Sequence, residues 1–328
     1  MTFEYKNVYI NETAIITGPY EKKGPLVNYF DKSYDDFYFG TKTWEQAEQK
    51  LIEEAVDLLF SKSKKTKFNI DLHISGDLLN QLVASNYAAS NLKLPYFGIY
   101  SACATSMEGL ILGANMIEGH QIKNCICTTS SHNNGAEKQF RYPVEYGGPK
   151  RKTTTFTVTG SAAALLSSEK AMIKIDSGTV GTVQDLGVKD VYHMGAVMAP
   201  AAANTIYQHL KDLKRDISYY DFVLTGDLGI YGKQILKEYM QMEYGIELKN
   251  YDDAACMIYA DTKEAYAGGS GPACLPLVGY GYILEKLKRK EYKRVLFVAT
   301  GALMNTSMVN QKLSIPSIAH AISLEVLR

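Results

Sequence analysis

The sequence predicts a layered α/β protein built from two similar halves. Helical and strand-like patterns alternate along the chain, segments of the first half are echoed in the second, and no Gly-, Pro- or Ser-rich linker separates the two halves. Of the 328 residues, 46% are hydrophobic and 21% are charged, a composition that supports a sizeable buried core. Alternating helices and strands are typical of buried sheets covered by helices.

The first half begins the alternation with a helix marked by Thr43 and Gln46, which form a capping-box pattern. Apolar residues then recur at helical spacing, at Ala47, Leu51, Ala55, Leu58 and Leu59. Strands are predicted at residues 70–75, 96–100 and 125–129. A further helix is expected from Met107 onward, with Gly119 as its stop signal.

The second half shows the same alternation. The predicted elements are a helix at 201–213, a strand at 222–225, a helix at 234–244, a strand at 254–259, a helix at 276–289, a strand at 295–300 and a last strand near 319–326. Residues 139–159, rich in Gly, Pro, Lys and Thr, are expected to form an elaborate loop, and such loops commonly carry functional sites.

Two pairs of segments indicate a duplication. Residues 71–78 (DLHISGDL) resemble residues 221–228 (DFVLTGDL), and residues 123–131 resemble residues 293–301. Each segment follows a predicted helix, and the order of the matches is the same in both halves. We therefore expect an N-terminal half at residues 1–172 and a C-terminal half at residues 173–328, joined in one compact unit.

Charge and cysteine content exclude several classes of protein. The 35 basic and 35 acidic side chains cancel, which argues against a nucleic-acid partner. No apolar run approaches the ~20 residues needed to span a bilayer, and residues 1–11 lack a signal-peptide layout, so we expect a cytoplasmic protein. Five cysteines do not form a disulfide framework. Cys125 and Cys127 share one face of a strand, which favours core packing over a metal site.

Cys103 is the candidate nucleophile. It follows an apolar run and directly precedes the predicted helix, where unpaired backbone N–H groups and the helix dipole favour a thiolate and an oxyanion. An inert, buried core cysteine would show the same local pattern. Both interpretations stay open at this point.

A cysteine at a strand-to-helix turn in the first half of a duplicated α/β chain resembles the layout of the thiolase superfamily. Longer motifs resemble, more narrowly, the stage V sporulation protein AD family of spore-forming Firmicutes. The motifs are at residues 18–26 (GPYEKKGPL), 76–81 (GDLLNQ), 128–133 (TTSSHN), 137–148 (EKQFRYPVEYGG), 198–203 (MAPAAA), 267–271 (AGGSG) and 315–320 (IPSIAH). The resemblance implies a thiolase-like fold, in which the duplicated halves form a five-layered α-β-α-β-α sandwich.

The resemblance also implies which catalytic partners Cys103 would need. Condensing enzymes supply a histidine and a second histidine, asparagine or cysteine from the second half. Here no histidine follows the strand ending at residues 225–228, and residues 268–271 (GGSG) lack an asparagine. Cys274 is a doubtful substitute. His320, placed just before the last predicted strand, is the candidate base, with a buried structural histidine as the alternative.

A binding function fits the remaining residues better. The family is associated with dipicolinic acid, a flat dianion that calls for apolar walls and cationic or N–H donors. Arg141, with a surface salt bridge as the alternative, and His132, with a strand-end hydrogen bond as the alternative, are candidate carboxylate contacts. The expected ligand-binding set is Cys103, Ala104, His132, Arg141, Gly269, Ser270 and His320. No metal or cofactor is expected.

The resemblance thus implies a protein that binds dipicolinic acid and supports its uptake into the developing spore. It would act without condensing activity, as a subunit beside other membrane subunits of the stage V sporulation complex, peripherally associated with the spore inner membrane. A homodimer is expected by analogy with the superfamily. The alternatives are an acyltransferase or condensing enzyme acting on acyl-CoA or acyl-carrier protein through Cys103, and a purely structural subunit.

Overall fold

The computed structural model describes residues 1–140, 150–259 and 265–327. The first half contains β1 (Thr2–Glu4), β2 (Tyr9–Thr17), β3 (Lys32–Ser33), α1 (Trp44–Ser63), β4 (Leu72–Gly76), α2 (Val83–Leu92), β5 (Tyr96–Gly98), α3 (Thr105–Glu118), β6 (Asn124–Ser131), α4 (Asn133–Phe140), β7 (Phe156–Thr157) and β8 (Gly160–Ser167).

The second half continues the alternation of helices and strands. It contains β9 (Ile173–Val180), α5 (Met194–Leu213), β10 (Phe222–Thr225), α6 (Gly229–Tyr244), β11 (Tyr251–Asp253), α7 (Ala254–Ile258), β12 (Gly269–Ser270), α8 (Cys274–Val278), α9 (Leu284–Lys288), β13 (Arg294–Ala302), α10 (Thr306–Asn310) and β14 (Ser317–Val326).

The strand order repeats between the halves. Hydrogen-bonded neighbours run β5-β4-β6-β8-β2 and then, in mirrored order, β9-β14-β13-β10-β11. In each set the three strands farthest from the junction are parallel: β5, β4 and β6 in the first set, and β11, β10 and β13 in the second. Strands β8 and β14 run antiparallel to their neighbours. A short antiparallel pairing of β2 with β9 joins the two sets. The predicted boundary between residues 172 and 173 stays a prediction.

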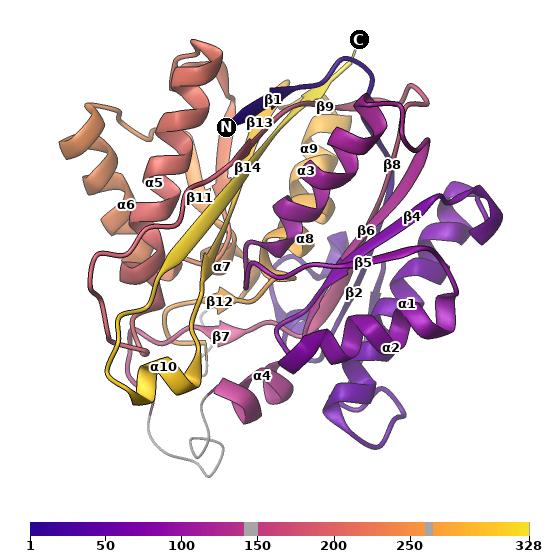
Figure 1. Cartoon of the computed structure of the whole chain (residues 1–328), viewed down its shortest axis with the longest axis horizontal. Helices are drawn as coiled ribbons and strands as arrows, with labels where there is room; N and C mark the ends of the chain where they lie inside the picture. The colour runs from indigo at the N-terminus through magenta and orange to yellow at the C-terminus, as the bar shows by residue number, and fades with distance from the viewer. Residues whose placement is uncertain (141–149, 260–264, 328) are drawn as a thin grey trace.

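The helices complete the layers (Figure 1). Helices α1 and α2 cover the outer face of the first set of strands, and α5 covers the outer face of the second set with α6 packed against it. Helix α3 contacts β4, β6 and β8 on one side and β9, β13 and β14 on the other, so it lies between the two sets, where α8 and α9 accompany it. The predicted duplicated, five-layered α/β fold is confirmed.

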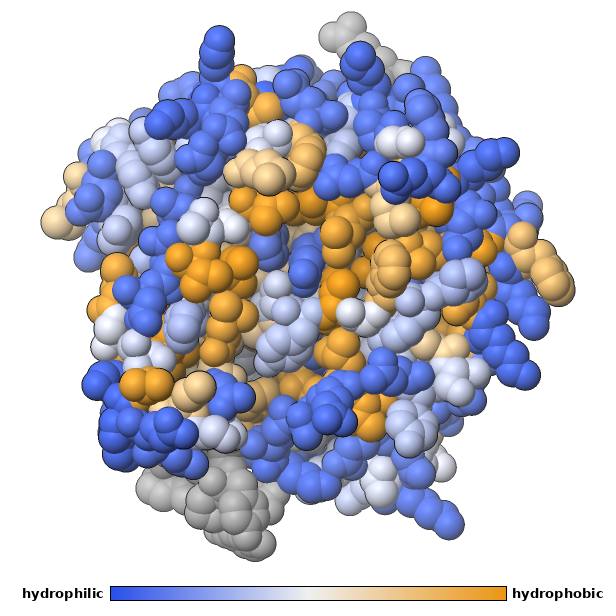
Figure 2. Space-filling model, viewed as in Figure 1, coloured by the Kyte–Doolittle hydropathy of each residue, from blue (hydrophilic) through white to orange (hydrophobic). Residues whose placement is uncertain are grey.

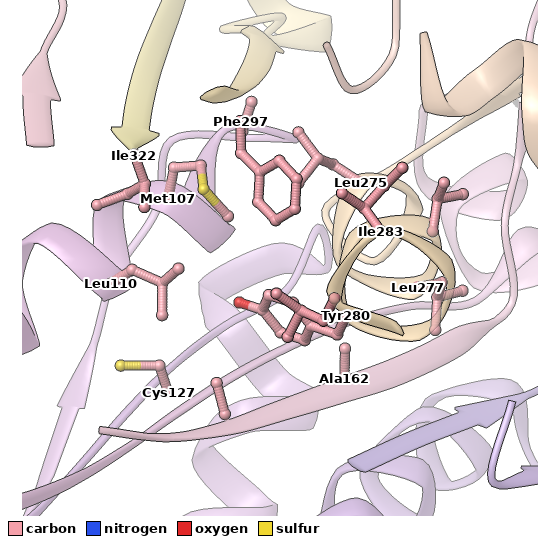
Figure 3. Packing of buried hydrophobic residues seen from close by; sticks show 14 of the residues in the cluster. Met107, Leu110, Cys127, Ala162, Leu275, Leu277, Tyr280, Ile283, Phe297 and Ile322 are labelled. Carbon is pink, nitrogen blue, oxygen red and sulfur yellow. The ribbon is translucent and has the colours of Figure 1, made fainter. Parts of the chain in front are cut away.

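The central layer holds the largest core cluster of the described residues. Figure 3 shows Met107 and Leu110 of α3 facing Tyr280 and Phe297, which come from the second half. All four side chains are buried, at 5% exposure or less, and each contributes roughly 1.5–3 kcal/mol on burial. The halves therefore share one interior.

The sequence echo has a structural counterpart in two aspartates. The Asp71 carboxylate accepts the backbone N–H of Asn124 at 2.9 Å, and the Asp221 carboxylate accepts that of Arg294 at the same distance. Each aspartate thereby fixes the start of the parallel neighbour of its own strand. The aspartate that begins each of the two similar segments, Asp71 and Asp221, thus sets the register between two parallel strands.

Three sequence-based assignments change. The strand predicted at 254–259 is wrong: β11 ends at Asp253, whose carboxylate accepts the N–H of Ala255 at 3.2 Å and starts the short helix α7 instead. The helix predicted at 276–289 begins at Cys274 and passes through a π-helical stretch at Gly279–Ile283. His320 lies inside β14 rather than before it. In the described part of the chain, no helix is long and apolar enough to cross a membrane.

Candidate functional site

Cys103 sits in a tight turn between β5 and α3. Ala102, directly before it, adopts φ = 50°, a left-handed conformation that is uncommon for a residue other than glycine. Thr105 holds the turn, because its hydroxyl accepts the Ser101 N–H at 2.9 Å and donates to the Ala102 carbonyl at 2.7 Å. The half-buried Cys103 is therefore held just before the first turn of α3.

Both halves hold this turn in place. Gly301 on β13 packs so closely that a Cβ there would lie 2.2 Å from the Ser101 carbonyl oxygen and 3.0 Å from the Ala104 nitrogen. From the other side, a Cβ on Gly76 at the end of β4 would lie 2.3 Å from the Ile99 carbonyl oxygen. Glycine is required at both positions by this close approach.

Cys103 lines a pocket between the two halves, with about 610 Å³ of empty space when its open mouth is included. Its apolar lining includes Leu78, Ala102, Phe140, Met194, Met198 and Met304, and its polar lining includes Cys103, Glu137, Thr155, Thr157 and Ser270. A wider groove adjoins it, because Leu78, Tyr100, Phe140 and Met304 line both.

The structure brings some of the predicted site residues together. Cys103 and Ser270 line the pocket from opposite halves of the chain. Ala104 and Gly269 are their chain neighbours and are buried, but they are not part of the lining. Arg141 lies outside the described residues, so its predicted contact with a ligand stays a prediction.

His132 directly follows β6, and its ring forms hydrogen bonds with backbone groups of Phe37 and Gly135. One of its ring nitrogens, Nε2, lies 2.7 Å from the Phe37 carbonyl oxygen, and the other accepts the Gly135 N–H at 3.4 Å. Burial lowers the pKa of His132 to about 4, so the ring is neutral at pH 7. These contacts correspond to the strand-end hydrogen-bonding alternative, and His132 is not among the described residues that line the pocket.

His320 is likewise outside the described pocket lining. Its backbone pairs with Ala299 of β13 and Val180 of β9, and its Nδ1 accepts the Gly181 N–H at 3.3 Å. Burial lowers the pKa of His320 to about 4. A general base works best with a pKa near the operating pH, so this neutral imidazole is poorly suited to activate a thiol.

Two buried aspartates, Asp227 and Asp253, lie close enough to Cys274 to affect its thiol. Asp227, which follows the strand where condensing enzymes would place a histidine, is completely buried. Burial and the neighbouring Asp253 raise the pKa of Asp227 well above its ordinary value. Burial, followed by the charge of Asp227, also raises the pKa of the Cys274 thiol. The Cys274 thiol therefore stays protonated at pH 7 and is unsuited to act as a second nucleophile.

Several lining residues were missed by sequence reasoning. Glu137 comes from α4, Thr155 and Thr157 from the chain around β7, and Met194 and Met198 from the first turns of α5. The loop signal at 139–159 and the motif at 198–203 mark these neighbourhoods, but neither indicates which side chains face a pocket. Among the described residues, no three His, Cys, Asp or Glu side chains gather closely enough to hold a metal ion.

A two-half fold with a cysteine at the start of the central helix, facing a pocket between the halves, defines a thiolase-like protein. Solved structures agree. The chain matches cerulenin-bound OleA of Xanthomonas campestris with a TM-score of 0.63 and 15% identity, over 98% of this chain and 100% of that chain. It also matches 3-oxoacyl-[acyl-carrier-protein] synthase III of Aquifex aeolicus VF5, with a TM-score of 0.54 and 13% identity, over 97% of each chain. At such identities the likeness concerns the fold alone.

Sequence comparison places the chain more narrowly. The family model for stage V sporulation protein AD matches residues 1–325. Stage V sporulation protein AD of Bacillus subtilis (strain 168) is 46% identical over 319 residues, which cover 97% of this chain and 94% of that protein. The chain therefore belongs to the stage V sporulation protein AD family.

Proposed function

We propose that the pocket at Cys103 binds dipicolinic acid, pyridine-2,6-dicarboxylic acid, without condensation chemistry. The observation that carries the proposal is a pocket whose described lining holds a cysteine but no histidine or asparagine. His320, the candidate base, uses its Nδ1 to accept the Gly181 N–H. A condensing enzyme needs groups that move protons and stabilise the enolate. A binding protein needs only a shaped cavity with a few polar contacts.

The lining suits a flat aromatic acid. Leu78, Phe140 and Met198 offer apolar and aromatic surface for a ring. The hydroxyls of Thr157 and Ser270 can donate hydrogen bonds to carboxylate oxygens, and such charge-assisted bonds are stronger than neutral ones. The start of α3 beside Cys103 adds the positive end of a helix dipole.

We further propose that the chain supports dipicolinate uptake into the developing spore as a peripheral partner of membrane subunits of the stage V sporulation complex. Membership of the sporulation family supports this role. Attachment to the spore inner membrane would then depend on contacts with those protein subunits. The pocket would present the ligand to them.

A homodimer along β5 is proposed as the working unit. Strand β5 is the outer strand of its set, and its Phe97 is 53% exposed. Tyr100, two residues beyond β5, and Leu112 of α3 are also exposed. Figure 2 shows apolar residues over the middle of this face, where Figure 1 places α3 and β5. An exposed apolar edge strand invites pairing with another chain.

The second candidate is acyl transfer through Cys103. The favouring observation is the strained turn that holds the cysteine just before α3, facing an apolar pocket. A slow acyl-enzyme that is not carried through to condensation would be consistent with the absence of a histidine in the described lining. Mass spectrometry after incubation with acetyl-CoA or octanoyl-CoA tests this candidate, since a Cys103 thioester adds a defined mass.

Calorimetric titration of dipicolinate into the purified protein tests the leading proposal. The expected result is saturable heat with one site per chain. An Ala302→Trp variant fills the pocket and should abolish the heat, whereas Lys170→Trp, at an exposed turn, should leave it unchanged. No saturable heat at millimolar dipicolinate with folded wild-type protein would refute the binding function.

A further inference from the structure

We propose that Glu137 competes with a carboxylate ligand for Lys150. The Glu137 carboxylate already pairs with Lys150, the cation that such a ligand would use. The inference rests on the proposed function, since it concerns how an anionic ligand is admitted to that pocket. It assigns Glu137 a role in setting affinity and charge selectivity, and it assigns Lys150 the role of the carboxylate anchor.

The geometry places this ion pair at the margin of the pocket. Glu137 lines the pocket from α4, and its Oε2 lies 3.3 Å from the Lys150 Nζ. The Glu137 and Lys150 side chains are only 10% and 20% exposed. The Lys150 Nζ also lies over the ring of Phe156, 5.5 Å from its centroid. Phe156 separates Thr155 and Thr157, two residues of the lining.

The charge of the pocket lining makes the Glu137–Lys150 pair important for the binding of an anionic ligand. Among the described residues that line the pocket, Glu137 supplies the carboxylate, and no lysine, arginine or histidine is present. A dianion entering the pocket therefore meets a negative charge, and Lys150, the cation beside that charge, is already paired with it. Because the pair is largely shielded from water, its attraction is stronger than that of a surface pair. A ligand carboxylate gains Lys150 only by displacing Glu137.

A second ion pair on the same helix provides a matched control. The Lys138 Nζ lies 2.6 Å from the Glu45 Oε1, with the two side chains 52% and 32% exposed. Neither residue is part of the described pocket lining. Glu45→Gln and Glu137→Gln change the net charge of the protein equally. A difference between the two variants therefore reports the local pair and not the overall charge.

The experiment compares two ligands by calorimetry at constant ionic strength: dipicolinate and its neutral isostere pyridine-2,6-dicarboxamide. Glu137→Gln should tighten dipicolinate binding about tenfold, which corresponds to releasing a partly buried ion pair. It should leave the diamide unchanged, and Glu45→Gln should change neither. Lys150→Met should weaken dipicolinate binding about tenfold or more, because the anchor is removed.

Several outcomes would overturn the inference while leaving the proposed function intact. If the wild type binds dipicolinate and Glu137→Gln binds it equally or more weakly, Glu137 is not a competitor. Equal tightening by Glu45→Gln would assign the effect to overall charge. If Glu137→Gln unfolds, Glu137→Asp keeps the charge but shortens the side chain, and it should also tighten binding; unchanged affinity there contradicts the proposal. Absence of binding in the folded wild type and in every folded variant would instead refute the proposed function.

Discussion

Raising the pH should destabilise the fold through Glu21, and the effect can be worked out from its surroundings. Glu21 is completely buried, and its Oε1 accepts hydrogen bonds from the Thr159 N–H and the Tyr259 hydroxyl. Burial raises the pKa of Glu21 from 4.5 to about 7, against the opposing effect of these hydrogen bonds. The folded state therefore holds the proton more tightly than the unfolded state.

The sign and size of the effect follow by linkage. A raised pKa in the folded state means that stability is fully present below the unfolded value of 4.5 and is lost as the pH rises toward the folded value of about 7. At about 1.4 kcal/mol per pKa unit, the total loss is on the order of 3 kcal/mol by pH 8. The loss corresponds to the cost of ionising a carboxyl group that is shielded from water.

The assay compares urea unfolding of the wild type and Glu21→Gln between pH 5 and pH 8. The glutamine keeps a carbonyl oxygen for both hydrogen bonds but cannot ionise. Its stability relative to the wild type should therefore rise by roughly 2.5 kcal/mol across this range, because part of the loss already occurs below pH 5. A difference that stays constant from pH 5 to pH 8 would refute the reasoning. Other buried acids titrate in both proteins and cancel in the comparison.

Three further predictions concern the site and its surface. Gly301→Ala should lower the melting temperature by at least several degrees, because its Cβ would meet the Ser101 carbonyl oxygen at 2.2 Å; an unchanged melting temperature would contradict the packing described. Cys103→Ala should keep dipicolinate affinity within about threefold by calorimetry, since no bond to sulfur is needed; a complete loss would favour the covalent alternative. Phe97→Asp, placing a charge on the exposed edge of β5, should shift the protein from dimer to monomer in light scattering; an unchanged mass would exclude that interface.

The fold could be predicted because its signals are local and repeated. The apolar spacing from Met107 to Ile117 predicts α3, which ends at Glu118 with Gly119 as its C-cap. Segment α7 was assigned wrongly because five residues are too few for a helical period, and the deciding contact is the Asp253 side chain on the Ala255 N–H. Short helices depend on such single contacts more than on periodicity.

The candidate site could be predicted only in part. Cys103 has a local signal, a helix start after an apolar run, and it does line the pocket. The surroundings of His132 and His320 depend on long-range contacts with Phe37 and Gly181, which no spacing along the chain indicates. Glu137 lies in one of the quoted motifs, but no spacing along the chain indicates its ion pair with Lys150.

The most direct test of the central claim is a crystal structure of the protein with dipicolinate. The account predicts ring density in the pocket beside Cys103, with one carboxylate near Ser270 or Thr157 and the other drawing Lys150 away from Glu137. The cysteine sulfur should carry no covalent adduct. An empty pocket at saturating dipicolinate, or ligand bound elsewhere on the surface, would contradict the account.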